Sequence, residues 1–164
     1  MRKGSIFLST TFILCLIAFD GYSQNDKNQG GEEQVKSLIE KKNFRFSALT
    51  VNPARGRLRN LTPGNYFIAV SPDSLVVDLP FFGRAFTAPI GASSGGFNFT
   101  SPEFDYRVAD TKDGGWDITL SPKKNDVRKI TLLISKGGNT TAIVNSNSRQ
   151  TISYNGFITA RDKR

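Results

Sequence analysis

The chain has 164 residues, of which 22 are Lys or Arg and 14 are Asp or Glu, so its formal net charge is +8. It contains no histidine, which excludes Ser-His-Asp and Cys-His nucleophilic sites and the usual zinc ligand sets. The basic residues are spread along the chain, so we interpret the charge as favouring solubility and do not expect nucleic-acid binding.

Residues 1–23 have the pattern of a secretory signal peptide. Arg2 and Lys3 give a positive start, a mostly apolar run follows from residue 4 to residue 19, and small residues precede Gln24. We predict cleavage near Ser23 and export to the periplasm or the extracellular space. The apolar run is shorter than the roughly 20 residues of a membrane-spanning helix, so we expect no membrane span after cleavage.

Cleavage after residue 23 removes Cys15, the single cysteine of the chain. The mature protein then has no disulfide, and its core alone must stabilise it, which a single domain of this length can achieve. An exported domain without disulfides is more typical of a bacterial envelope than of an animal extracellular space.

The polar, glycine-rich residues 24–31 predict a flexible linker. Residues 32–42 predict one helix, because Val35, Leu38 and Ile39 share a face at the i, i+3, i+4 spacing. A helix of about three turns is not stable alone, so this apolar stripe must dock on another element.

From residue 43 onward the pattern is that of β-strands. Apolar and polar residues alternate around Phe44–Ala48, Tyr66–Val70, Phe97–Thr100 and Phe104–Val108, and Leu75–Leu79 is a short apolar run. A last strand is expected over Thr151–Ala160, with a bend near Asn155-Gly156. The charged residues 161–164 are expected to be a frayed tail.

Two hairpins are predicted from glycine-containing turns. The first joins residues 104–108 to 116–121 through Asp113-Gly114-Gly115, and the second joins 127–135 to 139–145 through Gly137-Gly138. Since strands follow one another with short turns, the sheet should be largely antiparallel. We therefore expect a mainly β domain over residues 32–160, folded as a curled sheet, half-open barrel or sandwich, with one N-terminal helix.

Residues 79–99 carry an unusual concentration of aromatic side chains. Phe81, Phe82 and Phe86 surround one cation, Arg84, in a stretch interrupted by prolines and glycines. In one interpretation the phenylalanines fill the core, and Arg84 either extends its charged end to water or pairs with a carboxylate. In the other they form the wall of a pocket in which Arg84 holds an anionic or carbonyl group.

The same segment resembles a known family. The run Leu79–Phe86, followed by Ala88-Pro89 and Gly95-Gly96, and the C-terminal run Ser146–Gly156 are similar to a bacterial family catalogued as domain of unknown function 4251. The resemblance covers residues 33–160 and implies a small exported protein of Gram-negative bacteria, with no activity attached. The family pattern commonly has a tyrosine after the proline, whereas Phe81 and Phe82 have no hydroxyl, so we expect no role there that needs a polar atom.

The candidate ligand-binding residues are Phe81, Phe82, Arg84, Phe86, Arg149 and Tyr154. Arg149 and Tyr154 belong to the C-terminal run, and a hydrogen bond at a strand end is the alternative role for them. No catalytic residue, metal site or cofactor is expected. The ligand or envelope-protein partner and the oligomeric state stay open.

Two other patterns place charged residues two positions apart. Arg55, Arg57 and Arg59 would share one face of a strand, either as a polyanion-binding stripe or as charges that protect a sheet edge. Glu103 and Asp105 would also share a face, as a carboxylate-based glycan hydrolase requires, or simply as a solvated edge. We therefore expect a non-enzymatic binding domain, with a glycan hydrolase or a purely structural accessory protein as the alternatives.

Overall fold

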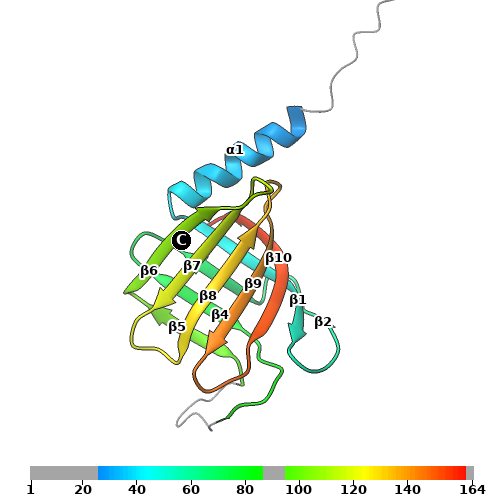
Figure 1. The fold of residues 1–164 in the computed structure, drawn as a ribbon, viewed down its shortest axis with the longest axis vertical. Helices are drawn as coiled ribbons and strands as arrows, with labels where there is room; N and C mark the ends of the chain where they lie inside the picture. Colours follow the sequence, from blue (N-terminus) through cyan, green and yellow to red (C-terminus); the bar gives the residue numbers. More distant parts are fainter. Residues whose placement is uncertain (1–25, 87–94, 162–164) are drawn as a thin grey trace, which may run out of the picture.

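The computed structural model describes residues 26–86 and 95–161, with the side chains of residues 26–30 excepted. The described residues form one helix and one antiparallel sheet that curls into a nearly closed barrel (Figure 1). Helix α1 (Asp26–Glu40) lies at one end of this barrel, at the top of Figure 1. The expected fold class is confirmed, and of the shapes considered the sheet adopts the barrel-like one.

Each strand pairs with its neighbours in antiparallel fashion, in the order β5-β4-β3-β1-β10-β9-β8-β7-β6, with the short β2 paired to β1. The first and last strands, β1 and β10, are therefore central neighbours. The strand bounds are β1 (Phe44–Pro53), β2 (Arg59–Asn60), β3 (Phe67–Val70), β4 (Leu75–Leu79), β5 (Phe97–Ser101), β6 (Phe104–Asp110), β7 (Trp116–Pro122), β8 (Val127–Ile134), β9 (Asn139–Ser146) and β10 (Ile152–Ala160).

Helix α1 starts earlier than the sequence pattern predicted. Residues 26–31, expected as part of a flexible linker, are helical, because a helix whose apolar face is docked extends readily by further turns. Val35 and Ile39 of that face are buried as expected. The helix ends at Glu40 because Lys42 adopts a left-handed φ of 49° and the amide of Asn43 bonds back to Leu38, a Schellman-type ending.

Both predicted hairpins are confirmed. In the first, β6 pairs with β7 from Phe104↔Pro122 to Asp110↔Trp116, and Gly114 in the turn has a φ of 76° that favours glycine. In the second, β8 pairs with β9 across a turn in which Gly138 has a φ of 83°. These glycines let short turns return the chain with little steric cost.

The bend expected near Gly156 corresponds to a β-bulge in the partner strand. Ala48 pairs with Gly156 and Thr50 pairs with Asn155, so Leu49 is the extra residue of β1. The backbone carbonyl of Ser47 lies so close that it would collide with any Cβ at position 156. Glycine is required there because the two backbones approach each other closely.

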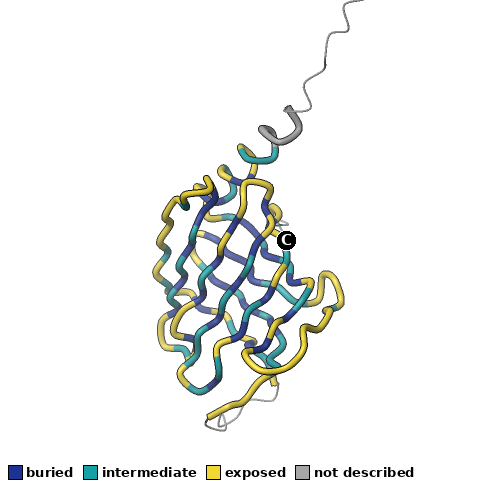
Figure 2. The backbone as a smooth tube through the Cα atoms, turned by 45° about the vertical axis from the view of Figure 1, so that its right-hand side comes forward, coloured by how far each residue is buried: buried dark blue, intermediate teal, exposed yellow. Residues whose placement is uncertain are grey.

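The core fills the inside of the barrel. Side chains alternate between buried and exposed along the strands, as the alternating colours of Figure 2 show. The largest fully buried side chains include Tyr154, Phe44 and Phe46.

Among the described residues, no helix is both long enough and apolar enough to cross a membrane. Residues 1–25, where the predicted signal peptide and its cleavage point fall, lie outside the described part.

Candidate functional site

The segment that follows β4 is attached to the loop between β9 and β10. Ala85 forms an isolated antiparallel bridge with Arg149, and the amide of Gln150 donates a hydrogen bond to the carbonyl of Arg84 at 3.1 Å. These contacts join two runs that lie more than 60 residues apart in the chain. They fix the backbone of the segment that the sequence analysis singled out.

Tyr154 holds the start of the same segment. Its side chain is fully buried, and its hydroxyl donates a hydrogen bond to the carbonyl of Pro80 at 2.7 Å. Burial raises the pKa of Tyr154 above its ordinary value, and the nearby Arg149 opposes that rise in pKa only in part. The tyrosine is therefore a neutral hydrogen-bond donor inside the barrel.

Arg149 holds the end of the segment from β4 to β5. This side chain is 8% exposed, and its Nη1 donates hydrogen bonds to the carbonyls of Gly96 at 2.8 Å and Gly95 at 3.3 Å. The guanidinium lies 5.2 Å from the ring centroid of Phe81 and 5.0 Å from that of Phe97. Two carbonyls and two aromatic rings thus stabilise this nearly buried cation.

Asp126 makes the loop after β9 rigid. Its carboxylate accepts hydrogen bonds from the hydroxyls of Ser146 and Ser148 at 2.5 and 2.7 Å, and from the amide of Ser148 at 3.2 Å. Burial alone would raise the pKa of Asp126, but hydrogen bonds from Ser146 and Ser148 outweigh it and lower this pKa. A rigid loop gives the bridge at Ala85 a fixed anchor.

Beside this anchored segment lies a hollow of about 370 Å³ that we call the arginine hollow. Its lining contains four arginines that come from two distant parts of the chain. The residues that line it are Pro53, Arg55, Gly56, Arg57, Arg59, Phe82, Gly83, Arg84 and Gln150. The volume falls within the range of small-ligand pockets.

The local structure explains how three of the arginines reach this hollow. Arg59 lies in β2, where it pairs with Val51 of β1, and its guanidinium lies 4.8 Å from the ring centroid of Phe82. Arg55 and Arg57 are in the loop before β2, so the prediction of one strand carrying all three arginines is wrong. The loop bends back at Gly56, whose φ of 127° disfavours other residues.

Among the described residues, the arginines of the hollow form no ion pair, and no Asp or Glu lines the hollow. The ion pairs in that part of the chain are Lys36–Glu40, Lys123–Asp105 and Lys136–Glu32, and none includes an arginine of the hollow. All four arginines are exposed. Like charges gathered without a counter-charge produce a strongly positive local potential, which attracts anions.

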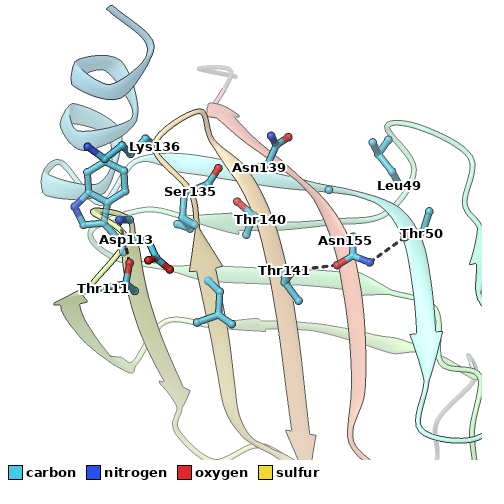
Figure 3. A pocket seen from close by; sticks show the side chains of 15 residues that line it. Leu49, Thr50, Thr111, Asp113, Ser135, Lys136, Asn139, Thr140, Thr141 and Asn155 are labelled. Atoms are coloured by element: carbon cyan, nitrogen blue, oxygen red, sulfur yellow. Dashed lines mark hydrogen bonds between the residues drawn. The ribbon is translucent and has the colours of Figure 1, made fainter. Parts of the chain in front are cut away.

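A larger hollow of about 790 Å³ lies over strands β7 to β10 and β1 (Figure 3). Some of its polar groups already have partners. The hydroxyl of Thr141 donates to Asn155 at 3.0 Å, and the amide of Asn155 donates to Thr50 at 3.4 Å. Lys136, which also lines it, is paired with Glu32 at 3.2 Å. Size favours this hollow as a binding site, whereas unpaired charge favours the arginine hollow, and we give charge the greater weight.

The carboxylates of the hydrolase alternative do not have the properties of an acid–base pair. The carboxylate of Asp105 is exposed and accepts a hydrogen bond from Lys123, and this bond lowers its pKa. A general acid needs the opposite, a raised pKa. Glu103 is exposed in the turn before β6.

Within the described ranges, no group of His, Cys, Asp or Glu residues is arranged to hold a metal ion.

The structure separates the six predicted site residues. Phe82 and Arg84 line the arginine hollow. Phe81 packs against the core, Phe86 is 68% exposed outside the lining, and Arg149 and Tyr154 bind backbone carbonyls. Arg84 itself is exposed, so the expectation of apolar surroundings for its side chain is wrong.

The spacing of Arg55, Arg57 and Arg59 by two residues predicts a stripe on one strand and does not connect these residues with Arg84. Gln150, which contacts the backbone of Arg84 and lines the same hollow, lies in the C-terminal run that resembles the family but is not among the predicted site residues. No local pattern indicates that residues 55–59 and 82–84 meet, because the barrel brings them together.

Comparisons with known proteins support one assignment. The model of a family described as a domain of unknown function (DUF4251) matches residues 26–158. The fold is similar to the crystal structure of a DUF4251 family protein from Bacteroides eggerthii, with a TM-score of 0.61 and 18% sequence identity over 84% of this chain and 92% of that chain. No curated protein matches the chain.

Proposed function

Because the chain belongs to the DUF4251 family, whose description states no activity, we propose from its geometry that it is a non-enzymatic binding domain for a multiply charged anionic ligand. The observation that carries this proposal is the arginine hollow, with four exposed arginines, and with neither an acidic lining residue nor an ion pair to these arginines among the described residues. The ligand would be a small molecule, or the end of a larger one, that bears several phosphate, sulfate or carboxylate groups.

The chemistry of the side chains suits such a ligand. Arginine presents a planar fork of N–H donors that matches carboxylate and phosphate oxygens in pairs. Arg59 already lies against the ring of Phe82, which orients its guanidinium and limits the entropy lost on binding. The backbone of Arg84 is held by Gln150, so this cation too is presented from a fixed position.

We propose that the protein acts outside the cytoplasm, after cleavage near Ser23. The charged start, the apolar run and the small residues of 1–23 support this proposal. The intact mass of the protein isolated from the envelope fraction tests it. A mass that includes residues 1–23 would contradict export with cleavage.

Calorimetric titration with inorganic tripolyphosphate and, separately, with citrate tests the binding proposal. The Arg59→Gln/Arg84→Gln double variant should bind at least about a hundredfold more weakly, because each lost charge-assisted hydrogen bond corresponds to roughly tenfold or more in affinity. Both positions are exposed, so the thermal melt should not change. Comparing the two probes shows whether phosphate or carboxylate is preferred.

The matched control removes two positive charges elsewhere. Arg128 and Lys129 are exposed on β8 and do not line the arginine hollow, so Arg128→Gln/Lys129→Gln should bind nearly as the wild type does. If both double variants weaken binding equally, the effect is one of net charge and the site is elsewhere. Absence of heat for both probes at about 20 mM ionic strength, where screening is weak, would also contradict the proposal.

A further inference from the structure

Strand β6 has one free edge. It is the last strand in the sheet order, and within the described residues it pairs with β7 alone. In Figure 1 it lies at the left side of the barrel wall, with no strand drawn beside it on that side. A strand edge offers a row of backbone N–H and C=O groups that can pair with another chain.

The hydrogen-bond alternation of an antiparallel ladder identifies which groups are free. The amide of Thr111 bonds to the carbonyl of Gly115, and the amide of Lys123 bonds to the carbonyl of Glu103, so odd-numbered residues of this hairpin bond across to β7. The even-numbered residues therefore direct their N–H and C=O groups to the free edge. They are Phe104, Tyr106 and Val108, with Asp110 at the strand end.

The odd-numbered side chains stand on the outer face of the barrel. Asp105, Arg107 and Ala109 are all exposed there. Asp105 is paired with Lys123, which directly follows β7, whereas Arg107 has no ion pair within the described part of the chain. An acidic and a basic residue thus lie two positions apart on the same face of an unpaired edge.

We propose that β6 pairs with β6 of a second copy of this chain, in antiparallel orientation around a twofold axis at Tyr106. In that register Tyr106 lies opposite the second copy's Tyr106, and the free N–H and C=O groups of both strands meet. Asp105 then lies opposite the second copy's Arg107, and Arg107 opposite the second copy's Asp105. The two opposite-charge pairs select this register.

The neighbouring registers are disfavoured. A shift in one direction places Arg107 opposite the second copy's Arg107, and a shift in the other direction places Asp105 opposite the second copy's Asp105. Like charges directly opposite each other destabilise a strand pair. The charge pattern of β6 therefore complements the same strand turned by half a rotation, which is the requirement for a symmetric interface.

Space beside the strand is consistent with this pairing. A hollow of about 460 Å³ lies between the end of α1 and the second half of β6, and Val108 at its side is 44% exposed. Pairing would cover this apolar side chain. Five to seven residues of strand contact bury less area than most stable interfaces, so we expect a reversible dimer that dissociates on dilution.

Sedimentation velocity over a range of concentrations tests the proposal. The wild type should show a monomer–dimer equilibrium, and Val108→Pro should lose the dimer, because it removes an N–H that faces the free edge and is not needed by β7. Asp105→Lys and Arg107→Asp should each lose the dimer too, since each makes the outer face of β6 carry one sign of charge. Arg128→Asp, on the exposed face of β8, is the control and should dimerise as the wild type does.

Mixing the two charge variants distinguishes specific pairing from general destabilisation. Asp105→Lys and Arg107→Asp should form a mixed dimer together, because each residue again faces an opposite charge across the twofold axis. A wild type that stays monomeric up to several hundred micromolar would overturn the proposal. So would a dimer that survives Val108→Pro and both charge variants, and so would a pair of variants that does not associate on mixing. A monomeric protein that binds extended peptides at β6 would show that the edge serves another partner.

Discussion

At the scale of single residues, Arg84 and Arg149 have two different roles. Arg149 is nearly buried and bound to two carbonyls between two aromatic rings, whereas Arg84 is exposed at the arginine hollow. Burial together with bonded carbonyls and neighbouring aromatic rings indicates a structural group, because a buried cation without partners would be very costly. Exposure without a partner indicates a group available for a ligand.

This difference predicts the effect of Arg149→Met. The substitution leaves the carbonyls of Gly95 and Gly96 without their donor, so the free energy of unfolding should fall by about 1–3 kcal/mol. Binding of tripolyphosphate should not change, because Arg149 is not part of the arginine hollow. Urea unfolding and calorimetry measure the two quantities. Loss of binding with unchanged stability would assign Arg149 to the site.

At the scale of elements, the structure of the β6–β7 hairpin is determined by its local sequence. Its alternating residues, its turn and its register all follow from a run of fewer than 20 residues. The same local information was insufficient for the loop before β2. Alternation of Arg55, Arg57 and Arg59 predicted a strand, but only Arg59 and Asn60 lie beside β1 and pair with it. Strand formation needs a partner, which a local pattern does not supply.

The hairpin also carries a stability prediction. Trp116 pairs with Asp110 on one side and Ile134 on the other, and 7% of its surface is exposed. Trp116→Ala should therefore lower the free energy of unfolding by about 3–5 kcal/mol, the range for large aromatic truncations in a core. Denaturant unfolding at constant m-value checks it. A loss below about 1 kcal/mol would contradict the packing of Trp116 inside the barrel.

At the scale of the whole molecule, the free energy of unfolding should depend more strongly on pH in the alkaline range than near neutral pH. It contains no histidine. Burial raises the pKa of both Tyr106 and Tyr154 in the folded protein. A pKa raised above the unfolded value of about 10 contributes stability that is complete below pH 10 and is lost as the pH rises toward the folded pKa.

We therefore predict a steep alkaline loss of stability. The free energy of unfolding should change little between about pH 7 and pH 9, and should then fall by up to about 1.4 kcal/mol per pH unit for each buried tyrosine. Tyr154→Phe should be less stable at pH 8, because Pro80 loses its donor, yet its alkaline slope should be shallower. Urea unfolding from pH 8 to 11.5 measures both effects. An unchanged slope in Tyr154→Phe would contradict the role given to its burial.

The sequence by itself determined the secondary structure class, both glycine-turn hairpins, most strand positions and the N-terminal helix. These features depend on residue periodicity and turn chemistry over short distances. Sequence similarity also identified the family, whose model covers residues 26–158.

Only the tertiary structure decided which distant segments meet. Pairing of β1 with β10 joins residues about a hundred positions apart and connects the two halves of the sheet at its centre. The bridge of Ala85 to Arg149 and the pairing of β2 with β1 then bring Arg84 to the arginines of residues 55–59. Local patterns carry no information on such contacts, because they form only when the whole sheet curls and the core excludes water. The candidate site is therefore a property of the folded barrel.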